Sequence, residues 1–267
     1  MLFDFALYLA VGTVAGLLAG LLGIGGGLLV VVALSFTLPT LGVPAARVMH
    51  VAVATSLASI VLTAIASTRA HWRRGSVLPH TLAWLTPGLV AGGLAGAAVA
   101  GRLPGTALRI GVAVFCVFSA WRMAFGASAS AGAEHEHEPR SPWLLVAGTG
   151  IGALSALVGI GGGTLTVPLL VALKARPVRA VGTSAACGLV IALASATGYA
   201  RGGHDIQGLP AGSLGYIYVP AALAVALASM LMAPVGAHLA HRLHATQLKR
   251  VFAAFLLVVG ALIASGR

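Results

Sequence analysis

Long uncharged apolar runs constrain the fold of this 267-residue chain more than any other feature of its sequence. A bilayer core of about 30 Å is crossed by about 20 apolar helical residues. Charges, prolines and glycines divide the sequence into about eight such runs, at residues 5–34, 48–68, 80–101, 106–125, 143–173, 181–200, 214–240 and 248–265. Lipid cannot satisfy free backbone groups, and the alternating ten-residue pattern of a membrane barrel is not seen. We therefore expect an all-α polytopic membrane protein with about eight transmembrane helices.

The composition excludes the soluble classes. Apolar residues make up 59% of the chain and charged residues 8%, with a mean hydropathy of +1.01, far outside the soluble range. A formal charge of +11 would suggest a nucleic-acid partner in a soluble protein. Here the basic residues fall singly or in twos and threes between apolar runs, as they do in membrane loops and at interfaces. The expected partner is the lipid bilayer, and no nucleic acid is expected.

The sequence contains an internal repeat. GTVAGLLAGLLGIGGGLL from Gly12 matches GTGIGALSALVGIGGGTL from Gly148, and AGRL from Ala100 matches AHRL from Ala240. The Thr-Ser pair at residues 55–56 likewise matches the pair at 183–184. Self-similarity that keeps its order over this length indicates a duplicated unit. The predicted organisation is a first membrane repeat over residues 1–125, a linker over 126–142 and a second membrane repeat over 143–267.

The linker, GASASAGAEHEHEPRSP, is rich in small and polar residues and holds most of the acids. Its EHEHE run carries imidazole and carboxylate groups that bind transition metals, but consecutive residues of a flexible segment have no fixed geometry. A solvated hinge is the favoured interpretation. No metal site and no cofactor are predicted.

Each half opens with an apolar run that contains Gly-Ile-Gly-Gly-Gly, at residues 23–27 and 159–163. Each helical glycine costs about 1 kcal/mol relative to alanine, so the helix is expected to break there. The half-helix that follows a break presents unpaired N–H groups and a partial positive charge, which together favour an anion. Paired breaks in corresponding positions are typical of a transporter binding site. Gly12, Gly16 and Gly20, spaced by four, are instead expected to allow close helix packing.

Hydroxyl side chains near the two breaks are further candidate donors. The matched Thr-Ser pairs begin the next run of each half, and Thr164 and Thr166 follow the second break, where the first half has Leu28 and Val30. Serine and threonine in membrane helices also bond to the preceding turn or to a neighbouring helix, and that alternative stays open for the two pairs. The predicted substrate-binding residues are Gly25, Gly26, Gly27, Thr55, Ser56, Gly161, Gly162, Gly163, Thr164, Thr183 and Ser184.

The acidic residues argue against proton-coupled antiport. None of Asp4, Glu134, Glu136, Glu138 and Asp205 lies in the middle of a predicted span, so no carboxylate is available there as a proton relay. No nucleophile with a neighbouring base, no phosphate loop and no redox motif is recognised in the sequence. The chain is not expected to be an enzyme, and no catalytic residue is predicted.

The glycine-rich opening of each half, the Thr-Ser pair that follows it and the later GRLPGTALR resemble the sulfite exporter TauE/SafE family of bacterial membrane permeases. The resemblance covers nearly the whole chain, although Val32 stands where the second half has Pro168. It implies a multi-pass protein of the cell inner membrane that moves a small sulfur-containing or organic anion, such as sulfite, sulfoacetate or thiosulfate, with export the expected direction. A homo-oligomer is compatible with this. The alternative is a non-transporting membrane protein, such as an assembly or metal-handling factor that uses the EHEHE linker.

The distribution of Lys and Arg between the loops only slightly favours one orientation of the chain across the membrane. With four spans in each half, nine basic residues lie on one side and seven on the other, which places both termini and the linker outside. If each GIGGG is instead a re-entrant turn, the parity of the spans changes and the halves become inverted repeats.

Overall fold

The computed structural model describes residues 2–22, 26–125, 138–139, 141–204, 206, 208–240 and 245–265. Among these residues, four helices are long and apolar enough to cross a membrane: α3 (Ala45–Arg73), α4 (Pro79–Arg102), α5 (Gly105–Phe125) and α8 (Pro177–Gly202). Pro79 and Pro177 occupy the first turn of their helices, where a missing N–H costs no hydrogen bond. The remaining helices are also apolar, so the predicted all-α membrane class is confirmed.

Each of the two glycine-broken runs forms two helices. The first forms α1 (Leu2–Leu22) and α2 (Gly27–Thr37), and the second forms α6 (Trp143–Val158) and α7 (Gly163–Ala172). The described chain is completed by the 3₁₀ turn η1 (Pro39–Leu41), helices α9 (Val219–Ala240) and α10 (Ala245–Ser265), and a short antiparallel pair, β1 (Ser213–Leu214) with β2 (Ile217–Tyr218). The expected eight runs therefore become ten helices among the described residues.

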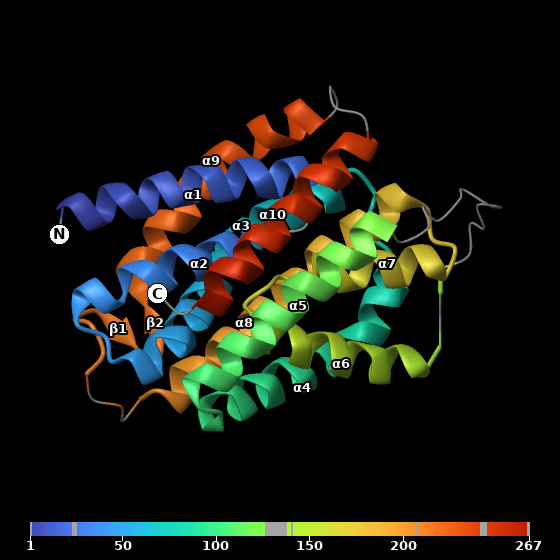
Figure 1. The fold of residues 1–267 in the computed structure, drawn as a ribbon. Helices are drawn as coiled ribbons and strands as arrows, with labels where there is room; N and C mark the ends of the chain where they lie inside the picture. The colour runs from blue at the N-terminus through green and yellow to red at the C-terminus, as the bar shows by residue number, and fades with distance from the viewer. Residues whose placement is uncertain are drawn as a thin grey trace.

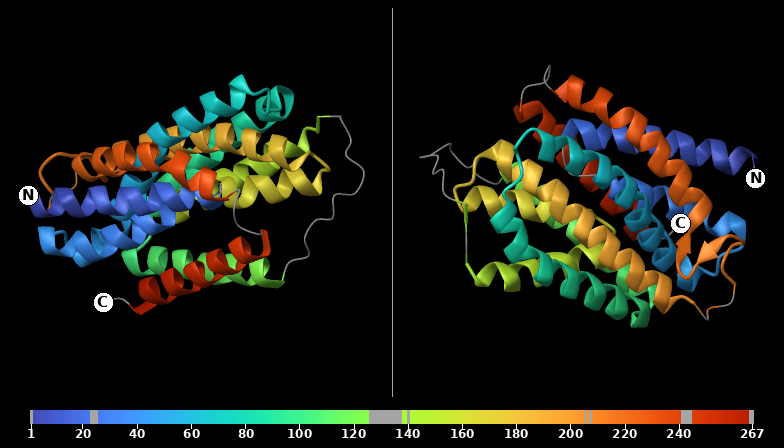
Figure 2. Two further views of the ribbon diagram at one scale, coloured as in Figure 1. Left: turned by 90° about the horizontal axis from the view of Figure 1, so that it is seen from above. Right: turned by 180° about the vertical axis from the view of Figure 1, so that it is seen from behind.

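The chain reverses direction at the breaks. A Cβ built on Gly26 would lie 2.7 Å from the carbonyl carbon of Ala15, so α2 starts alongside α1 and runs back toward its beginning. In Figures 1 and 2, α1 and α6 run in opposite directions, as do α3 and α8. The two halves are therefore inverted relative to each other.

The inversion also separates the first and last helices from the junction between the halves. In Figure 1, α1 begins and α10 ends toward one end of the molecule, whereas α5 ends and α6 begins toward the other, which we call the linker end. The expectation that termini and linker share one side rests on four spans in each half, and it is wrong because the re-entrant turns give each half an odd number of helices.

Helices of one half pack closely against helices of the other. A Cβ on Gly12 of α1 would lie 2.6 Å from the carbonyl oxygen of Val225 in α9, and one on Gly16 would lie 2.5 Å from Ser229 Cα. On the second half, a Cβ on Gly148 of α6 would lie 2.7 Å from Leu85 O in α4. The packing role predicted for Gly12 and Gly16 is confirmed, while the surroundings of Gly20 lie outside the description.

The two longest helices, α3 and α8, pack against each other in the middle of the molecule (Figure 2). They bury polar side chains as well as apolar ones: His50, Thr55, Ser56 and Ser59 on α3, and Thr183, Ser184 and Ser195 on α8. Buried polar groups need hydrogen-bond partners, so this pair of helices determines where polar interactions form inside the protein.

Candidate functional site

The two glycine breaks meet beside the middle of α3 and α8. A Cβ on Gly27 would lie 2.5 Å from the carbonyl oxygen of Gly159, so the two backbones touch with no side chain between them. Gly161 lies between the two central helices. A Cβ built on Gly161 would lie 3.1 Å from Ile60 Cγ2 on α3, and the carbonyl oxygen of Gly161 faces Gly188 of α8. The tertiary structure therefore brings together two motifs that are far apart in the sequence.

The second break has the geometry of a helix start without a side-chain cap. Gly159 ends α6 with a φ of 81° and Gly162 precedes α7 with a φ of 75°, both in the left-handed region that favours glycine. The carbonyl of Gly162 accepts the N–H groups of Leu165 and Thr166 at 3.0 and 2.8 Å. The N–H groups of Gly163 and Thr164 lie before this first helical bond, at the positive end of α7.

Two hydroxyl groups lie in the first turn of α7. Thr166 is fully buried, and its Oγ1 atom has no hydrogen-bond partner within the described part of the chain. That atom is 3.5 Å from the place where a Cβ on Gly162 would lie. The Oγ1 atom of Thr164 is likewise buried and has no partner among the described residues. A buried hydroxyl without a partner costs about 1–3 kcal/mol, so these groups suit a ligand that accepts hydrogen bonds.

The first break is built in a similar way but lacks these hydroxyls. Gly26 precedes α2 without a side-chain cap, and its carbonyl accepts the N–H groups of Leu29 and Val30. Gly26 and Gly27 lie at the start of α2, whereas Gly25 lies outside the described residues. Leu28 and Val30 occupy the first turn in place of threonines, so the two helix starts are chemically unequal.

The matched threonines support the backbone of other segments. Thr55 Oγ1 accepts the N–H of Tyr218 at 2.9 Å, just before α9. Thr183 Oγ1 accepts the N–H of Leu78 at 2.9 Å, just before α4, and donates to Arg179 O at 2.8 Å. Each threonine therefore binds the residue that precedes a helix of the other half: Thr55 of α3 the one before α9, and Thr183 of α8 the one before α4.

The matched serines lie deeper. Ser56 donates to the carbonyl oxygens of Gly27 and Gly159, each 2.9 Å away, and so contacts both breaks. Ser184 is buried on α8, next to Thr183. Ser155, in the last turn of α6, was not predicted, although its buried Oγ has no partner within the described residues. A single serine in an apolar helix carries no sequence pattern that would have identified it.

Comparisons with known proteins assign the chain to a family. The family model of the sulfite exporter TauE/SafE matches residues 8–263. The chain belongs to this family. It is also 34% identical to a probable membrane transporter protein of Haemophilus influenzae, over 95% of each chain.

Probable membrane transporter proteins of Methanocaldococcus jannaschii and Bacillus subtilis are 29% and 23% identical to it, and each match covers at least 93% of both chains. No solved structure matches. This TauE/SafE protein is therefore a lipid-embedded member of a membrane transporter family and not of an enzyme family.

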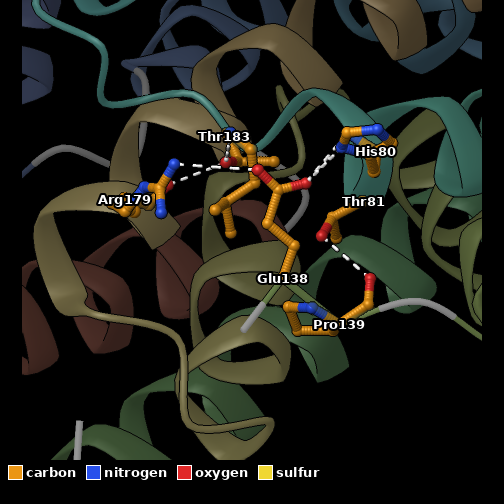
Figure 3. A network of polar contacts seen from close by, with 7 residues as sticks. His80, Thr81, Glu138, Pro139, Arg179 and Thr183 are labelled. Carbon is orange, nitrogen blue, oxygen red and sulfur yellow. Dashed lines mark hydrogen bonds and ion pairs between the residues drawn. The ribbon is translucent and has the colours of Figure 1, made fainter. Parts of the chain in front are cut away.

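A polar network lies at the linker end of this TauE/SafE protein (Figure 3). The carboxylate of Glu138 accepts the backbone N–H of His80 at 3.2 Å, contacts His80 Nδ1 at 2.8 Å and lies 3.7 Å from Arg179. Thr81 Oγ1 donates to Pro139 O at 2.9 Å. The network connects the end of the linker with the first turns of α4 and α8.

Residue Glu138 is the part of the EHEHE run that the structure describes, and residues 134–137 lie outside it. Within the described ranges, no group of three His, Cys, Asp or Glu side chains is placed to hold a metal ion. The observed contacts of Glu138 are those of a carboxylate at a helix N-terminus and beside a cation.

Proposed function

We propose that this protein is a permease that exports a small oxyanion, sulfur-containing or organic, across the inner membrane. Sulfite, sulfoacetate and thiosulfate are the candidate substrates. The start of α7 carries the proposal, because this helix begins beside the middle of the two central helices. Its first turn holds two buried hydroxyls that have no hydrogen-bond partner among the described residues.

The donors at this site are all neutral. The N–H groups of Gly163 and Thr164 and the hydroxyls of Thr164 and Thr166 offer hydrogen bonds and a partial positive charge to an anion. A fixed lysine or arginine would hold the anion more strongly and slow its release. Neutral donors therefore suit a site that must bind and release in each transport cycle. Gly26 and Gly27 of the first break and Ser184 are proposed to complete the lining around the anion.

The membrane potential suffices to drive export in this proposal. An inside-negative potential contributes about 2.3 kcal/mol per charge per 100 mV to the exit of an anion. No acidic residue lies in the middle of a helix within the described residues, so we propose transport without proton coupling.

Flux measurements on liposomes test the proposal, with sulfite, thiosulfate and sulfoacetate supplied in turn. The diagnostic variant is Thr166→Val, which keeps the shape of the side chain and removes the hydroxyl. A hydrogen bond to a charged ligand is worth about 1.5–3 kcal/mol, so the half-saturation concentration should rise about tenfold or more. The same variant should make the empty protein more stable, because a buried unpartnered hydroxyl is lost.

The matched control is Thr197→Val on α8, whose exposed hydroxyl donates to its own helix at Leu193 O. It should leave flux unchanged. An unchanged half-saturation concentration in Thr166→Val would mean that the start of α7 is not part of the binding site. If the wild-type protein moves none of the three anions, the permease proposal is abandoned in favour of a non-transporting membrane protein.

A further inference from the structure

The hydroxyl of Ser56 donates differently from the hydroxyls of Ser59 and Thr63, which follow it on α3. Ser59 and Thr63 donate to the carbonyls three residues earlier, Ser56 O and Ile60 O, which is the usual behaviour of hydroxyls in membrane helices. The hydroxyl of Ser56 instead reaches Gly27 O and Gly159 O, 29 and 103 residues away in sequence. The Ser56 side chain therefore connects α3 to two other segments of the fold.

The two acceptors belong to the two different breaks. Gly27 is the first residue of α2 in the first half, and Gly159 ends α6 in the second half. The last carbonyls of a helix lack partners within it, so Ser56 supplies a donor that α6 cannot. Ser56 is fully buried, so water does not replace this bond.

The same contact fixes the spacing of the breaks. A Cβ on Gly27 would lie 2.5 Å from Gly159 O and 3.1 Å from Ser56 Oγ, so the three groups pack with no room for another side chain. A hydroxyl carries one proton, which the two carbonyls must share. Its donor is committed to the backbone and is not available to a ligand.

We propose that Ser56 is a positioning residue that holds the two breaks in register and thereby sets the affinity of the anion site at α7, without contacting the anion. The effect on affinity rests on the proposed function. The effect on the spacing of the breaks does not, so the two can be tested separately.

The first measurement is the distance between spin labels at Phe36 on α2 and Leu154 on α6, both exposed positions, after replacement of Cys116 and Cys187. Ser56→Ala should shift or broaden the distance distribution, because both carbonyls lose their shared donor. The matched control is Ser59→Ala, which removes a buried hydroxyl of the same size one turn along α3. It should leave the distribution unchanged.

The second measurement is sulfite flux per folded molecule. Ser56→Ala should raise the half-saturation concentration about tenfold while the maximal flux stays within about twofold, since a lost hydrogen bond of about 1–1.5 kcal/mol acts on binding. Ser59→Ala should change neither quantity. Should Ser56→Ala not fold, Ser56→Cys keeps a weak donor of similar shape and should give a smaller change in the same direction.

Unchanged label distances in Ser56→Ala, or changed distances with an unchanged half-saturation concentration, would overturn the inference. A wild-type protein without anion flux would refute the permease proposal instead, and the label distances would still decide whether Ser56 holds the breaks together.

Discussion

The hydroxyl residues show that one side-chain type serves different purposes at different positions. Thr55 and Thr183 accept backbone N–H groups from the segments that enter α9 and α4. Thr166, which is equally buried, has no partner within the described chain. An anion that accepts hydrogen bonds would benefit from the free hydroxyl of Thr166, whereas Thr55 and Thr183 are already used by the fold.

Glycine at position 162 is required by both conformation and space. Gly162 lies at the start of α7 with a φ of 75°, and a Cβ there would lie 2.5 Å from Ile191 Cδ1 of α8. We expect Gly162→Ala to insert into membranes normally but to lose at least about tenfold in flux per folded molecule, because the methyl group strains the backbone at the proposed site.

Residue Gly42 provides the control for backbone strain alone. Its φ is 80°, and nothing lies within 4 Å of its Cβ position. Gly42→Ala should cost about 1 kcal/mol of stability and leave the flux per folded molecule unchanged. Equal flux losses in the two variants would mean that Gly162 has no special role in transport.

At the scale of the helices, close backbone contacts connect the halves. Gly148 and Gly152 of α6 pack on α4, with Cβ positions 2.7 Å from Leu85 O and 2.6 Å from Leu89 O, and Gly12 and Gly16 of α1 pack on α9 in the same way. Because helices in lipid associate through van der Waals contact, any added volume at these points separates them.

We therefore predict that Gly148→Val lowers the stability of the protein in detergent by about 1–3 kcal/mol, the usual cost of overpacking. Two residues away on the same helix, Gly150 is exposed and has open space at its Cβ position. Thermal unfolding should be nearly unchanged in Gly150→Val. A similar loss in both variants would indicate that helix propensity and not packing is responsible.

For the whole molecule, the inverted arrangement changes the distribution of charge between its two ends. Thirteen of the 16 basic residues lie in the described ranges, and nine of them are near the helix ends at the linker end: Arg69, Arg73, Arg74, Arg122, Lys174, Arg176, Arg179, Lys249 and Arg250. The other four described basic residues, near the end where α1 begins, are Arg47, Arg102, Arg109 and Arg201. This imbalance is clearer than the nine against seven expected from four spans in each half. Loops rich in Lys and Arg stay in the cytoplasm, so the imbalance indicates an orientation.

The expected orientation has the linker end in the cytoplasm and both termini outside. In a chain without Cys116 and Cys187, Ser130→Cys in the linker should react with a membrane-impermeant thiol reagent only after the cells are opened. Thr40→Cys, at the exposed turn η1 of the opposite end, should react in intact cells. The reverse pattern would contradict the orientation.

The sequence alone determined the membrane class and the position of the helix breaks, because run length, hydropathy and consecutive glycines act locally on the chain. It also identified Thr164 and Thr166 as hydroxyls that follow a break. It could not decide whether the chain continues or reverses at GIGGG, since glycine permits either, and the direction of each half and the charge of each end follow from that reversal.

Only the tertiary structure distinguished the matched hydroxyls. Thr55 and Ser56 are adjacent in sequence, yet one accepts a backbone N–H before α9 while the other joins Gly27 to Gly159. A hydroxyl is both donor and acceptor, so its role depends on which groups it meets. Those groups lie up to 163 residues away along the chain, and only packing of the two halves brings them within hydrogen-bond distance.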